Sequence, residues 1–369
     1  MLPTIGLVGA GRTEAPMNIS IGILAHNEEQ RIGRTLEELL GQSVLQACFA
    51  DAGNRVEVVC VVNGSTDSTA EVARAAFSDA KCGQYVDLRV VEVRQKGKVN
   101  AWNEYVHRIS CPDADFLVFM DADIRFSAGD VLEQLVEALN ADTSAWASVS
   151  SPIKHLASKP RKNLFDRLSL LHSRSGGLSK SWICGQLYCM RTAIARRIVL
   201  PRGLLVEDGF LSLMLTSDLF SWDPFEPRQD SAARVIHPPR ASHVFEAYTR
   251  LGDLLRQGRR QAAAHAINLI LREWILANRG EMSGADAIAA ACHNDRDWFA
   301  KYLARRVGER WWVMPRGEAV GRFRVGMSRF STDGPMAVLL AVAGYGWAMT
   351  TYSLANVHLK RQRSAAGIW

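Results

Sequence analysis

Hydrophobic and polar residues follow two different periods along the first third of the chain. Four short apolar runs, rich in β-branched and aromatic residues, have the length of buried strands: residues 18–27, 55–64, 86–94 and 115–121. The segments between them carry apolar residues at helical spacing: residues 28–42, 65–77 and 97–109. Three strand–helix pairs followed by a fourth strand predict right-handed crossovers. We therefore expect an α/β fold with a central, mostly parallel sheet layered with helices.

Polar side chains stand where these predicted strands end. Asn27 lies at the C-terminal end of the first strand and Asn63 at that of the second, and Asp121 and Asp123 follow the apolar run "FLVFM". In open parallel sheets, ligands bind outside the carboxyl ends of the strands. The four residues therefore predict a single site at that edge of the sheet.

The regular alternation fades after about residue 150. The stretch 185–191, "GQLYCMR", has the composition of another strand, and 206–215, "VEDGFLSLML", predicts a helix. Residues 245–278 predict one long helix, or two if Gly258 breaks it. The second half of the chain is therefore expected to be mainly helical.

Residues 335–357 contain no charged side chain. A bilayer needs roughly 20 apolar residues in a helix, so this segment either spans or contacts a membrane, or is a buried helix. The preceding stretch 309–326, "ERWWVMPRGEAVGRFRVG", is basic and rich in tryptophan, and basic residues also follow the segment. We therefore expect membrane contact through residues 310–363.

Composition and charge narrow the class of protein. The chain of 369 residues has a net charge of +6, and eight Lys or Arg against two Glu lie between residues 301 and 330. Such a patch favours an anionic partner: nucleic acid, a phosphorylated ligand or anionic lipid. The seven cysteines are scattered, without a Cys-x-x-Cys pair, and no signal peptide is visible. We therefore expect no disulfide framework, no zinc site and a cytoplasmic location.

Two pairs of carboxylates are candidates for chemistry. Asp121 and Asp123 at a strand exit are hard oxygen ligands suited to Mg²⁺ or Mn²⁺ bridged to a diphosphate, although aspartates there also serve as turn or cap residues. Glu207 and Asp208 precede a predicted helix, where they act either as dipole partners or, for one of them, as a general base.

Two basic motifs accompany these acids. The stretch 256–261, "RQGRRQ", either grips phosphates or forms a solvated helix face. Lys98 follows the turn residue Gly97 at the start of a predicted helix, which is a natural anion site.

The order of the motifs is more specific than any single one. "ILAHNEE", "VVNGSTDST", "KGKVNAWN", "FMDAD", "LLVEDGFL" and "QGRRQ" follow one another in a way that resembles the family 2 glycosyltransferases of the GT-A fold. The resemblance spans about residues 17–261. It implies a nucleotide-sugar transferase that inverts the anomeric centre.

The resemblance also implies roles for individual residues. Asp208 matches the catalytic base, with Glu207 beside it, and Gly185 and Gln186 match the acceptor side. Asp121 and Asp123 match the metal-binding acids, with His243 as a third ligand of Mg²⁺ or Mn²⁺. The residues matched to nucleotide-sugar binding are Ala25, Asn27, Glu28, Asn63, Asp67, Lys98, Asp121, Arg259 and Arg260. Gln261 stands where processive synthases carry Trp, which argues against processive polymer synthesis.

The implied organisation has five parts. An extension (1–16) precedes a transferase domain (17–245), divided into a nucleotide-sugar half (17–125) and an acceptor half (126–245). A helical basic region (246–334), the apolar helix (335–357) and a basic tail (358–369) follow.

The implied function is hexosyl transfer from a UDP- or GDP-linked donor to a glycan or lipid-linked acceptor in cell-surface polysaccharide or lipid-linked glycan assembly. We therefore expect the protein at the cytoplasmic face of the inner membrane, peripheral or anchored, without a nucleic-acid partner. The alternative is an inactive, membrane-bound scaffold. A nucleotidyltransferase would need a glycine-rich basic loop where "AHNEEQR" stands, and a dinucleotide-binding dehydrogenase would need Gly-x-Gly-x-x-Gly at the first turn.

Overall fold

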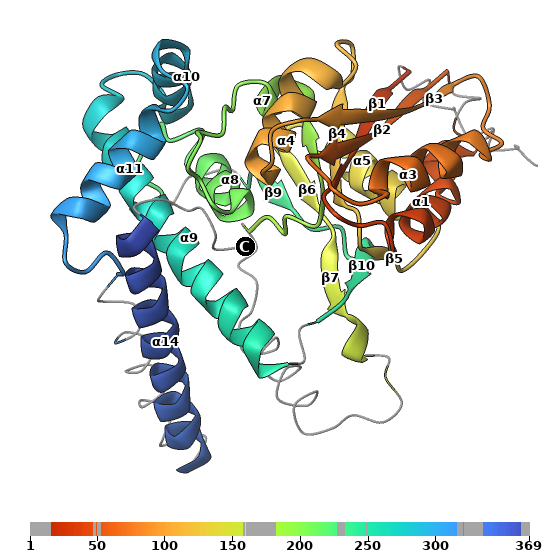
Figure 1. Cartoon of the computed structure of the whole chain (residues 1–369). Helices are drawn as coiled ribbons and strands as arrows, with labels where there is room; N and C mark the ends of the chain where they lie inside the picture. Colours follow the sequence, from red (N-terminus) through yellow and green to blue (C-terminus); the bar gives the residue numbers. More distant parts are fainter. Residues whose placement is uncertain are drawn as a thin grey trace, which may run out of the picture.

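A mostly parallel sheet organises the protein (Figure 1). The computed structural model describes residues 16–46, 53–157, 182–226, 233–247, 250–315 and 335–362, together with the single residues 49, 159 and 320. In this part of the chain, seven strands are ordered β3-β2-β1-β4-β8-β6-β9. They are β1 (Asn18–Ala25), β2 (Arg55–Asn63), β3 (Val86–Val93), β4 (Phe116–Asp121), β6 (Ala147–Val149), β8 (Leu187–Arg191) and β9 (Val235–Ile236).

The strand directions confirm the sequence prediction and extend it. β3, β2, β1 and β4 are mutually parallel, whereas β8 lies antiparallel between β4 and β6. A second, three-stranded sheet is ordered β5-β10-β7: β5 (Arg125–Phe126), β10 (Ser242–Phe245) and β7 (Ser151–Lys154). It joins the loop after β4 to segments far along the chain.

Helices cover both faces of the large sheet. The helices and helical turns are α1 (Ile32–Leu40), η1 (Ser43–Leu45), α3 (Thr69–Ser78), α4 (Lys98–Glu104), η2 (Tyr105–Ile109, a π-helix), α5 (Val131–Ala141), η3 (His155–Ala157), α7 (Thr192–Ala195), α8 (Glu207–Thr216), α9 (Leu251–Asn278), α10 (Gly284–Asn294), α11 (Trp298–Glu309) and α14 (Pro335–Gln362). α1, α3 and α5 share one apolar core; α4, α8 and the C-terminal helices share the other. The C-terminal helices therefore extend the core of the sheet.

β4 shows how the sequence creates these two cores. Its side chains alternate between the faces: Leu117 and Phe119 enter the core with α4 and α8, and Val118 and Met120 enter the core with α1. A strand covered on both sides is apolar at every position, which explains the unbroken run in the sequence. Its last residue, Asp121, is the first that reaches partly exposed space.

An aromatic stack fixes α4 against this strand. The Phe119 ring stacks between Trp102 and Tyr188, at centroid distances of 5.5 and 4.7 Å. The indole N–H of Trp102 donates a hydrogen bond to the Tyr188 hydroxyl at 2.9 Å. Because these side chains are buried, they hold the start of α4 beside the end of β4 and the start of β8.

The C-terminal half decides between alternatives that the sequence left open. α9 runs unbroken through Gly258, so residues 251–278 form one helix and not two. The uncharged segment forms a helix as predicted, but α14 continues to Gln362. No helix in the described ranges is long and apolar enough to cross a membrane.

Candidate active site

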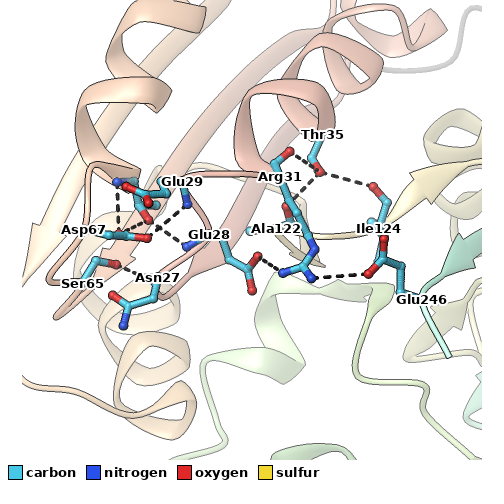
Figure 2. Close-up of polar contacts among 11 residues, drawn as sticks. Asn27, Glu28, Glu29, Arg31, Thr35, Ser65, Asp67, Ala122, Ile124 and Glu246 are labelled. Carbon is cyan, nitrogen blue, oxygen red and sulfur yellow. Dashed lines mark hydrogen bonds and ion pairs between the residues drawn. The ribbon is translucent and has the colours of Figure 1, made fainter. Parts of the chain in front are cut away.

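The loop that carries Asp121 and Asp123 is fixed from two sides. The Asp121 backbone N–H donates to the carbonyl of Gln186 at 2.8 Å, which ties the end of β4 to the segment before β8. On the other side, the Thr35 hydroxyl lies 2.8 Å from the carbonyl of Ala122 and 3.3 Å from that of Ile124 (Figure 2). The two carboxylates are therefore presented by a held loop.

The turns after β1 and β2 are also tied together. The Asn27 side-chain oxygen accepts a hydrogen bond from the Thr66 backbone N–H at 2.9 Å. The backbone N–H of Asn27 donates to the Ser65 hydroxyl at 3.0 Å. Asn27 has a φ of 55°, a left-handed conformation that asparagine tolerates better than most residues. Asp67 accepts from the Glu29 N–H at 3.2 Å, as Figure 2 shows. Asp67 thus joins the turn after β2 to the turn after β1.

Two further residues of the predicted nucleotide site lie at strand ends. Ala25 is the last residue of β1 and is fully buried. Asn63 ends β2, and its Oδ1 is buried without a hydrogen bond to any described residue. A buried acceptor without a partner is costly in a folded protein. Asn63 therefore suits a ligand that supplies an N–H.

Glu28 lies within electrostatic reach of Asp123. Burial raises the pKa of Glu28, and the charge of Asp123 raises it further, whereas Arg31 lowers it. Arg31 pairs with Glu28 at 3.2 Å and with Glu246 at 3.3 Å (Figure 2). The effect of the Asp123 charge on Glu28 indicates that these two carboxylates lie close enough to repel each other.

Lys98 is the centre of the site. Its ammonium lies 2.6 Å from Asp121 Oδ1, 2.9 Å from Glu207 Oε1 and 3.0 Å from the carbonyl of Gly185. Burial alone would lower the pKa of Lys98, but the charges of Asp121 and Glu207 outweigh it and hold that pKa well above its ordinary value. One permanently charged ammonium therefore joins the end of β4 to the start of α8.

Glu207 and Asp208 have different environments. The Glu207 side chain is 2% exposed and is held by Lys98. Asp208 forms no salt bridge with any described residue, and its Oδ1 accepts from the Gly209 N–H at 2.6 Å. Burial, and then the charge of Glu207, raise the pKa of Asp208 to about 6. Asp208 is thus the carboxylate with capacity to accept a proton near neutral pH.

Gly185 lies directly against these acids. A Cβ on Gly185 would stand 3.0 Å from Asp208 Cβ and 3.1 Å from Glu207 Oε1. Contacts this short would require Asp208 or Glu207 to move. The absence of a side chain at Gly185 is therefore part of how both acids are positioned.

His243 has a different position from the expected one. It is fully buried, with Nδ1 2.9 Å from the Ser150 hydroxyl and Nε2 3.3 Å from Gln186 Oε1, and burial lowers its pKa to about 4. Across the described residues, no three His, Cys, Asp or Glu side chains are grouped to hold a metal. His243 is therefore not assembled with Asp121 and Asp123 as a third metal ligand; it is neutral and orients Gln186.

Arg259 and Arg260 are neighbours on α9. The Arg260 charge lowers the pKa of Asp208, so the guanidinium lies within electrostatic reach of that carboxylate. The Nε of Arg259 is buried and has no hydrogen-bond partner among the described residues. A phosphate would satisfy such a donor.

Asp121 and Asp123 suit a metal ion that is bound to a nucleotide. Asp121 and Asp123 interact electrostatically, and burial raises the pKa of Asp121 to about 7 while Lys98 opposes the shift. Two carboxylates leave most coordination positions of Mg²⁺ or Mn²⁺ free, and these positions can be filled by diphosphate oxygens and water. The donor set thus suits a metal–nucleotide complex better than a closed, all-protein metal site.

Sequence reasoning did not find Thr35. Its hydroxyl holds the loop of Asp121 and Asp123, yet it contributes no charge. The available signal is its place on the apolar face of α1, between Ile32 and Leu36, where a polar residue needs a buried partner.

Comparison with known proteins defines the class of fold. The chain superposes on a mannosyltransferase from Pyrobaculum calidifontis, solved with GDP-Man and Mn²⁺, with a TM-score of 0.51 and 18% identity, over 95% of this chain and 89% of that one. A glucosyl-3-phosphoglycerate synthase from Mycobacterium tuberculosis, solved with Mn²⁺, UDP-Glc and phosphoglyceric acid, matches with a TM-score of 0.46 and 18% identity, over 74% and 85%. The first match confirms the expected GT-A class of fold.

The sequence comparisons indicate a likeness to one family. Residues 20–199 match the model described as glycosyl transferase family 2. Over 162 residues the chain is 27% identical to a 4,4'-diaponeurosporenoate glycosyltransferase from Staphylococcus haemolyticus; the match covers 43% of this chain and only 38% of that relative. Over residues 20–199 the chain is therefore similar to glycosyl transferase family 2.

Proposed function

We propose that the protein is an inverting glycosyltransferase that moves a hexosyl group from a UDP- or GDP-linked donor to an acceptor hydroxyl. The observation that carries the proposal is the contact of Lys98 with both Asp121 and Glu207. It puts the acids suited to a donor diphosphate next to Asp208, the acid suited to deprotonate an acceptor. The P. calidifontis mannosyltransferase, which has the same fold and holds GDP-Man with Mn²⁺, supports this donor class.

The donor lies along the ends of β1, β2 and β4. Asn63 Oδ1 accepts an N–H of the base, since this buried oxygen has no other partner among the described residues. Arg259 and Arg260 face the diphosphate with permanent charge. When bound at Asp121 and Asp123, Mg²⁺ or Mn²⁺ would neutralise diphosphate charge.

Transfer needs one base. Asp208 accepts the proton of the acceptor hydroxyl, and the hydroxyl oxygen forms a bond to the anomeric carbon as the bond from that carbon to the diphosphate oxygen breaks. Attack from the side opposite the leaving group inverts the anomeric configuration. Lys98 pairs with Glu207 and holds it in place, so Glu207 positions the site and is not assigned the role of base.

The acceptor is proposed to be a glycan or a lipid-linked glycan used in cell-surface assembly at the cytoplasmic face of the membrane. Gly185 lies against Asp208, and we assign Gly185 and its neighbour Gln186 to the acceptor side. The uncharged surface of α14, described below, supports a lipid-linked acceptor.

A donor screen tests the proposal. Purified protein is incubated with Mn²⁺ or Mg²⁺ and UDP-, GDP- and TDP-sugars, and release of nucleoside diphosphate is measured. We expect metal-dependent release from one donor class, reduced about 100-fold or more in D208N, and unchanged in D113N, which alters an exposed aspartate. Absence of release from every donor, or full release in D208N, would contradict the proposal.

A further inference from the structure

The exposed face of α14 has no charged side chain over most of its length. Between Pro335 and Val357 there is no charge, and Val342, Leu354 and Val357 are 52%, 44% and 47% exposed. Only one side is packed: Thr351, Ala355 and Leu359 are buried. A helix on a water-facing surface normally places charged residues on its outer face. The uncharged outer face of α14 therefore indicates a surface that another phase or molecule covers.

An apolar cavity of about 260 Å³ continues this surface. Its walls include Trp311 and Trp312 from the segment after α11, and Tyr345, Met349 and Tyr352 from α14. Trp311 is 75% exposed. Large exposed apolar patches mark interaction sites, and amphipathic rings of Trp and Tyr suit a boundary between water and lipid.

The charge at the end of α14 is positive. Arg361 is exposed there and forms no salt bridge with any described residue, and α14 has no acidic residue. On the adjoining α11, Arg305 is 66% exposed and lies at the long distance of 4.0 Å from Glu309. The neighbouring Arg306 and Arg310 are partly neutralised because both pair with Glu273, at 3.1 and 2.7 Å. The least neutralised positive charge is therefore at the edge of the apolar face.

This charge pattern distinguishes two kinds of partner. In a two-fold dimer, the same patch meets itself, so the positive edges would face each other without acids from α14 to pair with. An anionic lipid surface offers apolar chains beneath a negative headgroup layer, which complements both features.

The surface lies one helix away from the candidate active site. Gly258 of α9 packs against Thr351 and Trp347 of α14, while Arg260, two residues further along α9, reaches Asp208 electrostatically. Figure 1 shows α9 and α14 extending together away from the sheet. A bilayer on the outer face of α14 would therefore lie close to the acceptor side.

We infer that α14, together with residues 311–315, docks on an anionic lipid bilayer, with the apolar face and the aromatic cavity in contact with the acyl region and Arg305 and Arg361 among the headgroups. This surface binds in the interfacial plane. The inference stands on α14 and its surroundings and does not depend on the proposed transfer reaction.

Vesicle flotation tests this inference with the full chain. Binding is measured to phosphatidylcholine vesicles with and without phosphatidylglycerol as the anionic lipid. We expect binding to the anionic vesicles, weakened at high salt, and little binding to phosphatidylcholine alone. Quenching of tryptophan fluorescence by brominated acyl chains should accompany binding and be reduced in W311S.

Variants separate the apolar contribution to vesicle binding from the electrostatic one. V342D/L354D/V357D should weaken binding by about tenfold or more, and R305Q/R361Q by roughly fivefold per charge. M282D and K81Q alter an exposed apolar and an exposed basic residue on other elements, and should bind like the unaltered protein. Unchanged thermal unfolding of each variant shows that the fold is retained, since all the replaced side chains are largely exposed.

Three outcomes would overturn the inference. These are absence of binding to either kind of vesicle, equal binding by V342D/L354D/V357D, and a concentration-dependent dimer in light scattering that these substitutions abolish. The last outcome would assign the surface to a second copy of the chain.

Discussion

Neighbouring acids in this site have separate tasks because their partners differ. Glu207 is enclosed and ion-paired with Lys98, whereas Asp208 forms no salt bridge with any described residue and is balanced by the more distant charges of Lys98 and Arg260. Lys98 satisfies three oxygens at once, those of Asp121, Glu207 and Gly185. The chemistry of the site is thus set by which carboxylate the lysine holds.

The pH dependence of turnover should report Asp208. Its folded-state pKa of about 6 lies above the ordinary 3.8, so the carboxyl is protonated below pH 6 and cannot accept a proton. We expect kcat/KM to fall about tenfold per pH unit below that value. Donor turnover measured from pH 4.5 to 8, with metal kept saturating at each pH, checks this. A profile that stays flat down to pH 5 would remove Asp208 from the role of base.

Thr35 should matter more for activity than its neutral side chain suggests. T35V leaves the carbonyls of Ala122 and Ile124 without this hydroxyl, at a cost of about 1–3 kcal/mol in unfolding free energy. The loop of Asp121 and Asp123 should loosen, and the KM for the donor should rise.

T192V is a matched control for T35V. The Thr192 hydroxyl is buried and has no hydrogen-bond partner among the described residues, so its loss should change the unfolding free energy by no more than about 0.5 kcal/mol. Equal effects of the two substitutions on donor KM would show that Thr35 does not position the loop.

At the scale of elements, the site depends on the start of α4, the end of β4 and the start of α8. Trp102, Phe119 and Tyr188 fix α4 against the sheet, so Lys98 at the start of α4 reaches both acids. Gly185 allows the start of α8 to approach the segment before β8 closely. A change in any of these packing contacts moves the acids relative to one another.

Gly185 offers a sharp test of that packing. G185A places a methyl group 3.0 Å from Asp208 Cβ, so Asp208 must shift. A displacement near 1 Å can cost about 100-fold in rate, and we expect a loss of that order in kcat. Steady-state kinetics of G185A and G252A check it: a Cβ at Gly252 meets no atom within 4 Å, so G252A should be active. Full activity of G185A would contradict the proposed positioning.

The elements that the sequence predicted share a physical property. The first four strands and three helices follow local apolar periods, so they and the site at their ends were predictable. The antiparallel insertion of β8 and the small sheet of β5, β10 and β7 depend on pairing between distant segments of two to five residues. Short strands carry too little periodicity for a pattern to indicate their partners.

At the scale of the molecule, the C-terminal helices change how charge and hydrophobicity are distributed. The basic cluster after residue 300 is partly neutralised by Glu273, an acid distant in sequence, so counting charges overstated the patch. The uncharged segment is a helix packed on one side. A linear pattern gave its helical state, but only the tertiary contacts show which face remains uncovered.

We propose that Asp121 and Asp123 hold the metal-bound diphosphate of a nucleotide beside Asp208. The decisive measurement is isothermal titration of UDP and GDP in the presence of Mn²⁺, with D121N and the exposed-site variant D113N compared under the same conditions. We expect that one nucleotide binds, that chelation of the metal or D121N weakens binding by at least about tenfold, and that D113N has no effect. Absence of binding by either nucleotide, or binding equally tight in D121N, would contradict it.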